Sequence, residues 1–134
     1  MKKKIFAIGA LVVVMSVMLS MPAFAARYTY SFNVSPGSNY GVQFSGGNPK
    51  DDNEANAYVH TQSGNLIDSD FFYFSVYDIP VNDPAYRWTN YQPAHQNSAE
   101  YILHYNNPVY TGDYMYLQGD TDQYGVQISG YWYS

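Results

Sequence analysis

The chain contains no cysteine, and it has little positive charge. The absence of cysteine excludes a disulfide framework, a thiolate zinc site, a thiol nucleophile and a thioether-linked lipid anchor. Lys and Arg total 6 against 11 Asp and Glu in 134 residues, and three of the six lie at positions 2–4. Residues 26–134 keep Arg27, Lys50 and Arg87 against 11 acids, a formal net charge of −8. Such a domain cannot assemble a basic surface for nucleic acid, and it is poorly suited to anionic membranes.

The first 25 residues have the pattern of a cleaved signal peptide. The lysines at 2–4 form a charged start, residues 5–19 are apolar, and Ala23-Phe24-Ala25 after Pro22 is a small-x-small cleavage site. We expect cleavage after Ala25, secretion into the medium and no membrane insertion of the rest. The apolar stretch is also long enough to span a bilayer, so an uncleaved anchor is the alternative. Residues 26–134 have the size of one small domain.

Aliphatic side chains are scarce in that domain. Leu, Ile, Val and Phe account for only 19 of residues 26–134, a share that taken alone indicates disorder. The same stretch holds 16 Tyr and 2 Trp. These side chains bury large areas while their polar atoms find hydrogen-bond partners. We therefore predict a folded domain with an aromatic core.

Sustained helical periodicity is also missing from residues 26–134. Polar and apolar residues alternate with a period of two instead, which is typical of strands with one buried face. We predict an all-β fold, a single small antiparallel sandwich or flattened barrel of about seven or eight short strands. The expected strands are residues 28–34, 40–44, 55–61, 71–77, 86–91, 99–105, 113–118 and 124–132. Of these, 71–77 has the composition of a central strand, or of a steric zipper if it is ever exposed.

The last of these strands allows a detailed prediction. Its start, YGVQISG at 124–130, repeats YGVQFSG at 40–46; the two copies could be equivalent strands, or a coincidence within a small alphabet. Alternation places Tyr124, Val126, Ile128, Gly130 and Trp132 on one face of the strand, and we expect this face to be turned toward the core. We expect Gly130 to leave room for an aromatic ring. We also expect the strand to pair with residues 113–118 through a hairpin.

The stretch YGVQISGYW at 124–132 resembles a family of small secreted Gram-positive proteins labelled domain of unknown function 2712. The signal peptide, the overall length, the alternating tyrosines after the cleavage site and the Asp- and Asn-rich hairpin before the last strand are similar too. The resemblance implies secretion and a β domain, and it implies no activity. Other small secreted β-sandwiches, such as the lactococcin-like bacteriocins, are also rich in aromatic residues, and this comparison rests on fold class alone.

Calcium is the metal that the sequence suits best. Several hard oxygens stand together at residues 51–54, at Asp68 and Asp70, and at Asp120 and Asp122. The third group resembles the start of an EF-hand loop with Gly125 at the sixth position, but Tyr131 occupies the twelfth position, where a bidentate Glu is required. Tight turns recruit Asp and Asn for their own geometry as well. These acids are candidate ligands, and we predict no other cofactor.

Few residues point to catalysis. His60, His95 and His104 lack the paired spacing of a zinc site, and no Gly-x-Ser-x-Gly elbow occurs. The 11 acids leave open a carboxylate pair of the glycosidase kind, because sequence spacing does not give spatial separation. We expect no enzyme activity, and His104 exposed on the polar face of its strand.

The surplus of aromatic residues is the remaining signal. A candidate ligand platform consists of Tyr86, Arg87, Trp88 and Tyr91, since aromatic faces stack on sugar rings and low charge suits neutral ligands. The alternative is that these aromatics belong to the core. The predicted function is a secreted, non-enzymatic β domain that binds a cell-surface, matrix or protein partner. The other hypothesis is a secreted bacteriocin-like antagonist or inhibitor.

Overall fold

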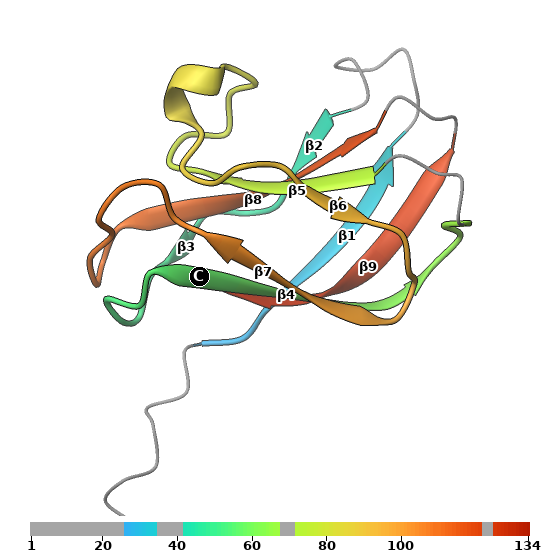
Figure 1. The fold of residues 1–134 in the computed structure, drawn as a ribbon, viewed down its shortest axis with the longest axis horizontal. Helices are drawn as coiled ribbons and strands as arrows, with labels where there is room; N and C mark the ends of the chain where they lie inside the picture. The colour runs from blue at the N-terminus through green and yellow to red at the C-terminus, as the bar shows by residue number, and fades with distance from the viewer. Residues whose placement is uncertain (1–25, 35–41, 68–71, 122–124) are drawn as a thin grey trace, which may run out of the picture.

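The computed structural model describes residues 26–34, 42–67, 72–121 and 125–134. The predicted signal peptide, Asp68, Asp70, Asp122 and Tyr124 lie outside these ranges. Within them the chain forms nine strands and one short 3-10 helix, and all strand pairs are antiparallel. The strands form two sheets that enclose one hydrophobic core (Figure 1). The predicted all-β sandwich is confirmed, with nine strands where about seven or eight were expected.

The first sheet has four strands in the order β1-β9-β4-β7. Their bounds are Tyr28–Val34 for β1, Val126–Tyr133 for β9, Asn56–Gly64 for β4 and Ala99–His104 for β7. Alternation along β1 and β9 turns every second side chain into the core and leaves the others on the opposite face. Glu100, Ile102 and His104 of β7 are exposed, as expected. One face of this sheet therefore closes the core and the other faces outward.

The second sheet has the order β2-β8-β5-β6, with β3 paired to β8. The bounds are Val42–Phe44 for β2, Asn48–Pro49 for β3, Phe72–Tyr77 for β5, Gln92–Ala94 for β6 and Tyr114–Thr121 for β8. In β5, Phe72, Phe74 and Val76 face the core, while Ser75 and Tyr77 on the other face are also fully buried. The predicted central strand covered on both faces is thus confirmed.

The core is aromatic, as predicted. Phe32, Phe72 and Phe74 form a ring cluster with centroid separations of 5.1 to 6.5 Å. Tyr30 packs edge-on against Phe74 at 5.6 Å. Trp132 is fully buried in the same cluster, on the side of β9 that alternation assigned to it. Burial of such rings supplies the hydrophobic area that the few aliphatic residues cannot.

The predicted hairpin between residues 113–118 and the last strand is wrong. β8 lies in the second sheet, whereas β9 pairs with β1 on one side and β4 on the other. Both strands bury one face against the same core from opposite sides, with Met115 and Leu117 of β8 facing Ile128 and Trp132 of β9. Two faces of one core are better closed by opposite sheets than by neighbouring strands of one sheet. The chain therefore changes sheet between β8 and β9 (Figure 1).

Residues 86–91 do not form the expected strand. Pro84–Tyr86 is a 3-10 helix, capped by Asp83, whose carboxylate accepts the N–H of Ala85. Pro84 at its first position fixes a helical φ, and only single bridges at Arg87 and Thr89 follow. The strands that sequence periodicity missed, β3 and β6, are short and contain proline, which an edge strand tolerates.

The two YGVQ copies do not occupy equivalent places. Val42–Phe44 forms β2 at the edge of the second sheet, whereas Val126 and Ile128 lie in β9 inside the first. Phe44 packs edge-on against Tyr77 at 5.3 Å instead of joining the main core cluster.

Across the described ranges the chain has no helix of the length and apolarity that a membrane span requires.

Candidate functional site

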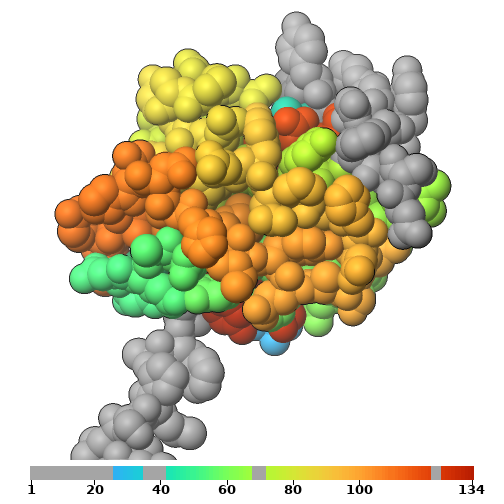
Figure 2. Space-filling view, in the orientation of Figure 1, coloured from blue at the N-terminus to red at the C-terminus, as the bar shows by residue number. Residues whose placement is uncertain are grey.

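The two outer sheet faces differ in whether the chain covers them. On the second sheet, the loop after β5 reaches back over the strands: the Gln118 amide donates to Asn82 Oδ1 at 3.2 Å, and Ser75 donates to Gln118 Oε1 at 2.7 Å. Gln118 and Ser75 are fully buried beneath this loop. Figure 2 shows the corresponding segment, in yellow, projecting from the top of the molecule. The middle of that outer face, around Ser75 and Gln118, is therefore part of the packed structure.

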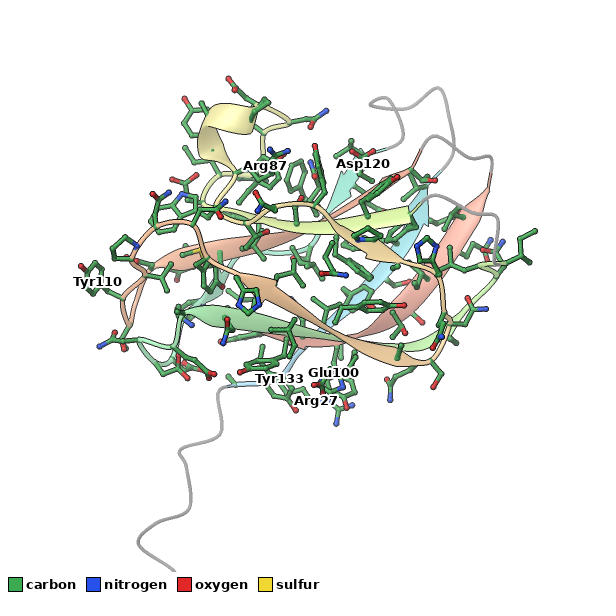
Figure 3. All side chains as sticks on the ribbon, in the orientation of Figure 1. Arg27, Arg87, Glu100, Tyr110, Asp120 and Tyr133 are labelled. Carbon is green, nitrogen blue, oxygen red and sulfur yellow. The ribbon has the colours of Figure 1, made fainter. Side chains whose placement is uncertain are left out.

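The outer face of the first sheet has no such cover among the described residues. Its strand register aligns Thr29, Tyr131, His60 and Glu100 in one row across all four strands. Figure 3 shows Arg27, Glu100 and Tyr133 gathered on this side, with Arg87 and Asp120 on the opposite side of the molecule. This surface, the outer face of β1-β9-β4-β7, is the candidate site.

A ladder of stacked side chains crosses this face. The Arg27 guanidinium lies 3.7 Å from the centroid of the Tyr131 ring, and the Tyr131 ring stacks on His60 at 4.5 Å and 17°. His60 Nε2 lies 3.0 Å from Glu100 Oε2. Tyr133 meets the rings of His60 and Tyr131 edge-on at 5.8 and 5.7 Å. Because Tyr131 is covered on both ring faces, this ladder offers ring edges and polar atoms to a ligand rather than an open stacking surface.

Beside the ladder lies a hollow of about 420 Å³ that spans β1, β9 and β4. Short neutral polar side chains line it: Ser31, Asn33, Ser63, Asn65, Gln127 and Ser129. Ser63 and Ser129 share a hydrogen bond of 2.8 Å between their hydroxyl oxygens. The core side chains Phe32 and Ile128 alternate with these residues and point inward. The composition of this hollow is a direct result of strand alternation.

A second hollow, of about 360 Å³, lies between β4 and β7. Its lining residues are His60, Thr61, Gln62, Ser98, Ala99 and Tyr131. Gln62 is the extra residue at a register shift in β4, between Thr61 and Ser63. A bulge of this kind bends its strand and redirects a side chain. The two hollows thus adjoin the same bulge, and we call them together the polar groove.

The strand after the bulge is anchored by one asparagine. Asn65 Oδ1 accepts the N–H of Gln127 at 2.8 Å, and its amide nitrogen donates to the carbonyl oxygen of Gly125 at 2.7 Å. The N–H of Asn65 in turn donates to the Gln127 carbonyl oxygen at 3.0 Å. These bonds replace the inter-strand backbone hydrogen bonds that the bulge interrupts. They hold the end of β4 against β9 and fix one wall of the polar groove.

Charge distinguishes the groove from the rest of the surface. Neither hollow is lined by Asp, Glu, Lys or Arg among the described residues. The neighbouring Arg27 and Glu100 stand at opposite ends of the ladder. Apart from His60, which is paired with Glu100, the described lining residues of the groove thus carry uncharged side chains on a domain of net charge −8.

The predicted ligand platform is only partly assembled. Arg87 lies over the Tyr91 ring at 4.2 Å, and Tyr91 meets Tyr73 edge-on at 6.0 Å. Trp88 is half-buried against the core, and its backbone N–H donates to the Val76 carbonyl oxygen at 2.8 Å. Tyr86 stands on the 3-10 helix with 37% of its surface exposed. The structure brings Arg87 and Tyr91 together, whereas Trp88 serves the core.

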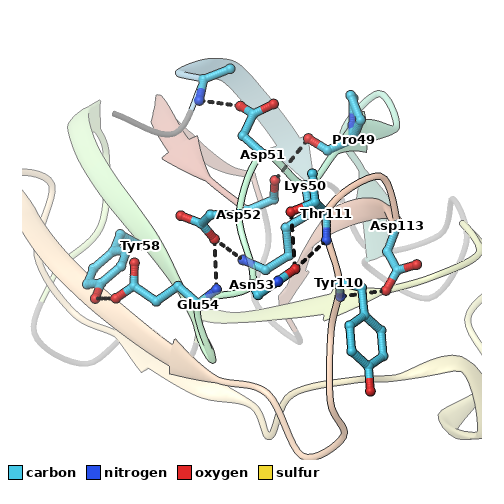
Figure 4. Close-up of polar contacts among 12 residues, drawn as sticks. Pro49, Lys50, Asp51, Asp52, Asn53, Glu54, Tyr58, Tyr110, Thr111 and Asp113 are labelled. Atoms are coloured by element: carbon cyan, nitrogen blue, oxygen red, sulfur yellow. Dashed lines mark hydrogen bonds and ion pairs between the residues drawn. The ribbon is translucent and has the colours of Figure 1, made fainter. Parts of the chain in front are cut away.

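The acidic loop at 51–54 is occupied by internal contacts (Figure 4). Asp52 pairs with Lys50 at 3.0 Å and accepts the N–H of Glu54 at 2.9 Å. Glu54 accepts the hydroxyl of Tyr58, and Asn53 Oδ1 accepts the N–H of Thr111 at 2.8 Å. Of the other calcium candidates, Asp120 lies in β8, and the described residues contain no group of three or more His, Asp and Glu that could hold a metal.

Lys50 is the residue that sequence reasoning missed. Its side chain is fully buried, with the ammonium group 5.1 Å from the centroid of the Tyr105 ring. Burial on its own would raise the pKa of Asp52, but the Glu54 N–H and the Lys50 ammonium outweigh it and lower that pKa below its usual value.

Among the histidines, His60 joins the ladder, His95 lies in a loop, and His104 contacts Asn56 on the exposed face.

Comparison of the chain with models of known protein families, with curated proteins and with solved structures found no match. The fold and the polar groove define the class, a small β-sandwich with a polar groove on the outer face of its first sheet.

Proposed function

We propose that this chain is a secreted, non-enzymatic domain that binds a polymer on a cell surface or matrix through the outer face of β1-β9-β4-β7. The observation that carries the proposal is the polar groove on the outer face of the first sheet, in a sandwich whose other outer face is covered in its middle by the loop after β5. Ligand sites are concave and carry a few placed polar groups. The resemblance at 124–132 to secreted Gram-positive proteins of the unknown-function 2712 type supports the choice of cell wall as the surface.

The test is a sedimentation assay with purified Gram-positive cell walls. Ser31 is exposed in the first hollow, so Ser31→Arg places a bulky side chain where the ligand would lie. Asn107→Arg introduces the same side chain at an exposed loop position outside both hollows. We expect wild type and Asn107→Arg to sediment with the walls equally, and Ser31→Arg to bind the walls about tenfold more weakly. Equal sedimentation of all three proteins would refute the groove as the binding site.

The antagonist hypothesis gives a different result in a second assay. A bacteriocin-like protein would inhibit the growth of indicator bacteria at concentrations where a binding module only coats them. We expect coated cells to grow normally. Growth inhibition that Ser31→Arg abolishes would favour the antagonist and keep the groove as its target-binding surface.

A further inference from the structure

We infer that the ligand of the polar groove is an uncharged, hydroxyl-rich polysaccharide chain that crosses the strands from β1 toward β7. This inference rests on the proposed function and adds the chemistry of the ligand. It is drawn from three features of the face: its charge, its hydrogen-bonding groups and the state of its aromatic rings.

The charge of the groove excludes a strongly ionic ligand. Among the described lining residues of both hollows, a polyanion such as a phosphate-rich wall polymer would meet no lysine or arginine, on a domain of net charge −8. A cationic ligand would meet no Asp or Glu among the same described residues. Glu100 is the carboxylate next to the groove, and it is paired with His60 at 3.0 Å. An uncharged ligand is desolvated at the lowest cost in such a site.

The groups in the first hollow match alcohols. Serine hydroxyls donate and accept, and Asn33 and Gln127 carry an amide donor and a carbonyl acceptor each. A sugar hydroxyl also donates and accepts, so each ring can satisfy several of these groups at once. The hydroxyls of Ser63 and Ser129 form a hydrogen bond of 2.8 Å with one another. After this bond, both can still accept hydrogen bonds and one of them can still donate.

An extended peptide fits this surface less well. Peptides that bind sheets add as a strand along an edge, where backbone groups are unpaired. The polar groove lies on a sheet face, where the backbone groups of β9 and β4 are consumed by their neighbours. The polar lining also offers few exposed apolar contacts for peptide side chains, since Phe32 and Ile128 are 2% exposed.

The ladder defines how a sugar chain would meet the aromatic end. Tyr131 is sandwiched between Arg27 and His60, so its ring faces are closed. A ligand would therefore hydrogen-bond to the edges of the ladder and to Gln62 and Ser98 in the second hollow. Together the two hollows reach from β1 to β7, across four strands that lie about 4.8 Å apart, a span that more than one sugar ring covers.

The experiment compares charge variants at one groove position and one control position. Ser31→Arg and Ser31→Glu are assayed for sedimentation with Gram-positive cell walls before and after protease digestion of the walls, beside Asn107→Arg and Asn107→Glu. For an uncharged ligand, Ser31→Arg and Ser31→Glu should both weaken binding by about tenfold, the equivalent of one lost hydrogen bond. The Asn107 pair measures how each charge alone alters attraction to the wall.

Three outcomes overturn one claim or the other. Binding that Ser31→Arg strengthens and Ser31→Glu weakens, beyond the Asn107 pair, means a polyanionic ligand and refutes the inference alone. Binding that disappears when the walls are digested with protease means a protein ligand and also refutes only the inference. Binding that no Ser31 variant changes refutes the proposed function itself.

Discussion

The carbonyl oxygen of His60 occupies the space in which a β-carbon on Gly130 would have to stand. The same carbonyl accepts the hydroxyl of Tyr30 at 3.3 Å. Both contacts lie at the start of the β4 bulge, where the chain turns its backbone toward β9. Gly130 was expected to make room for a ring, but the group that fills the space is backbone. Because Gly130 has no side chain, the backbone of the bulge that borders the polar groove can approach β9 this closely.

Gly130→Ala should therefore destabilise the domain by about 1–3 kcal/mol, because the clash is with backbone that cannot rotate away. Gly46→Ala is the matched control, since nothing lies within 4 Å of a β-carbon there. Chemical denaturation of the two variants measures the difference. Equal midpoints would show that β4 shifts without cost.

Because the bulge separates the two hollows, Gly130→Ala should also weaken wall binding at temperatures where it stays folded.

Trp132→Ala should cost about 3–5 kcal/mol, the usual range for truncation of a buried aromatic side chain. Trp132 is fully buried, and its indole N–H has no hydrogen-bond partner in the structure. Trp132→Phe should therefore lose much less, since it removes an unpaired donor together with part of the ring. Thermal melts of both variants decide this. A small loss in Trp132→Ala would place the side chain at the surface and contradict the packing against β1 and β4.

The fold class was accessible from sequence because alternation is a local signal. Burial in β1 and β9 follows the predicted period residue by residue. The pairing partner of β9 was not accessible, because two amphipathic strands such as β8 and β9 have the same pattern whether they share a sheet or face one another. Short edge strands with proline, such as β6, carry no periodicity at all.

The candidate site was only half accessible. Ser31, Gln127 and Ser129 could be assigned to outward positions from alternation, but nothing in the sequence aligns them in neighbouring strands. That alignment depends on the β1-β9-β4 register. Lys50 was missed for a different reason: a lysine between a proline and an acidic run suggests an exposed loop, and only tertiary packing shows it buried.

Two buried tyrosines should make the domain sensitive to alkali. Burial, and for Tyr105 also the charge of Asp52, raises the pKa of Tyr30 and Tyr105 well above the usual 10.0. Above that pH the unfolded chain releases protons that the folded chain retains, so stability falls as pH rises toward the folded pKa. Each group contributes up to about 1.4 kcal/mol per pH unit.

Tyr105→Phe and Tyr30→Phe separate this effect from lost hydrogen bonding. Both should flatten the fall of unfolding free energy above pH 10.0. Near neutral pH only Tyr30→Phe should lose stability, by about 1 kcal/mol, because the Tyr30 hydroxyl donates to His60 while that of Tyr105 has no partner. Urea titrations across this pH range provide the measurement. An unchanged slope in both variants would mean that neither phenol is shielded.

The buried ammonium of Lys50 is paired with the partly exposed carboxylate of Asp52. Asp52→Asn leaves the Lys50 ammonium buried without a counter-charge, which should cost about 1–3 kcal/mol near neutral pH. The pKa of Asp52 is lowered from 3.8, so its contribution is fully present above that value and is lost as pH falls through the lower folded pKa. The gap between wild type and Asp52→Asn should therefore close in acid.

The double variant Lys50→Met with Asp52→Asn tests the same pair without leaving a charge behind. Lys50 is held by its backbone, whose N–H donates to Asp113 and whose carbonyl accepts from Gly112, both at 2.8 Å, so methionine can occupy the same place. Replacement of a buried ion pair by an apolar side chain is often neutral. We expect the double variant to recover most of the stability that Asp52→Asn loses. Because it has neither the Lys50 ammonium nor the Asp52 carboxylate, its stability should not change with pH through the titration of Asp52. A double variant that is less stable than Asp52→Asn would mean that the ammonium makes further essential contacts, with the Tyr105 ring at 5.1 Å as the first to examine.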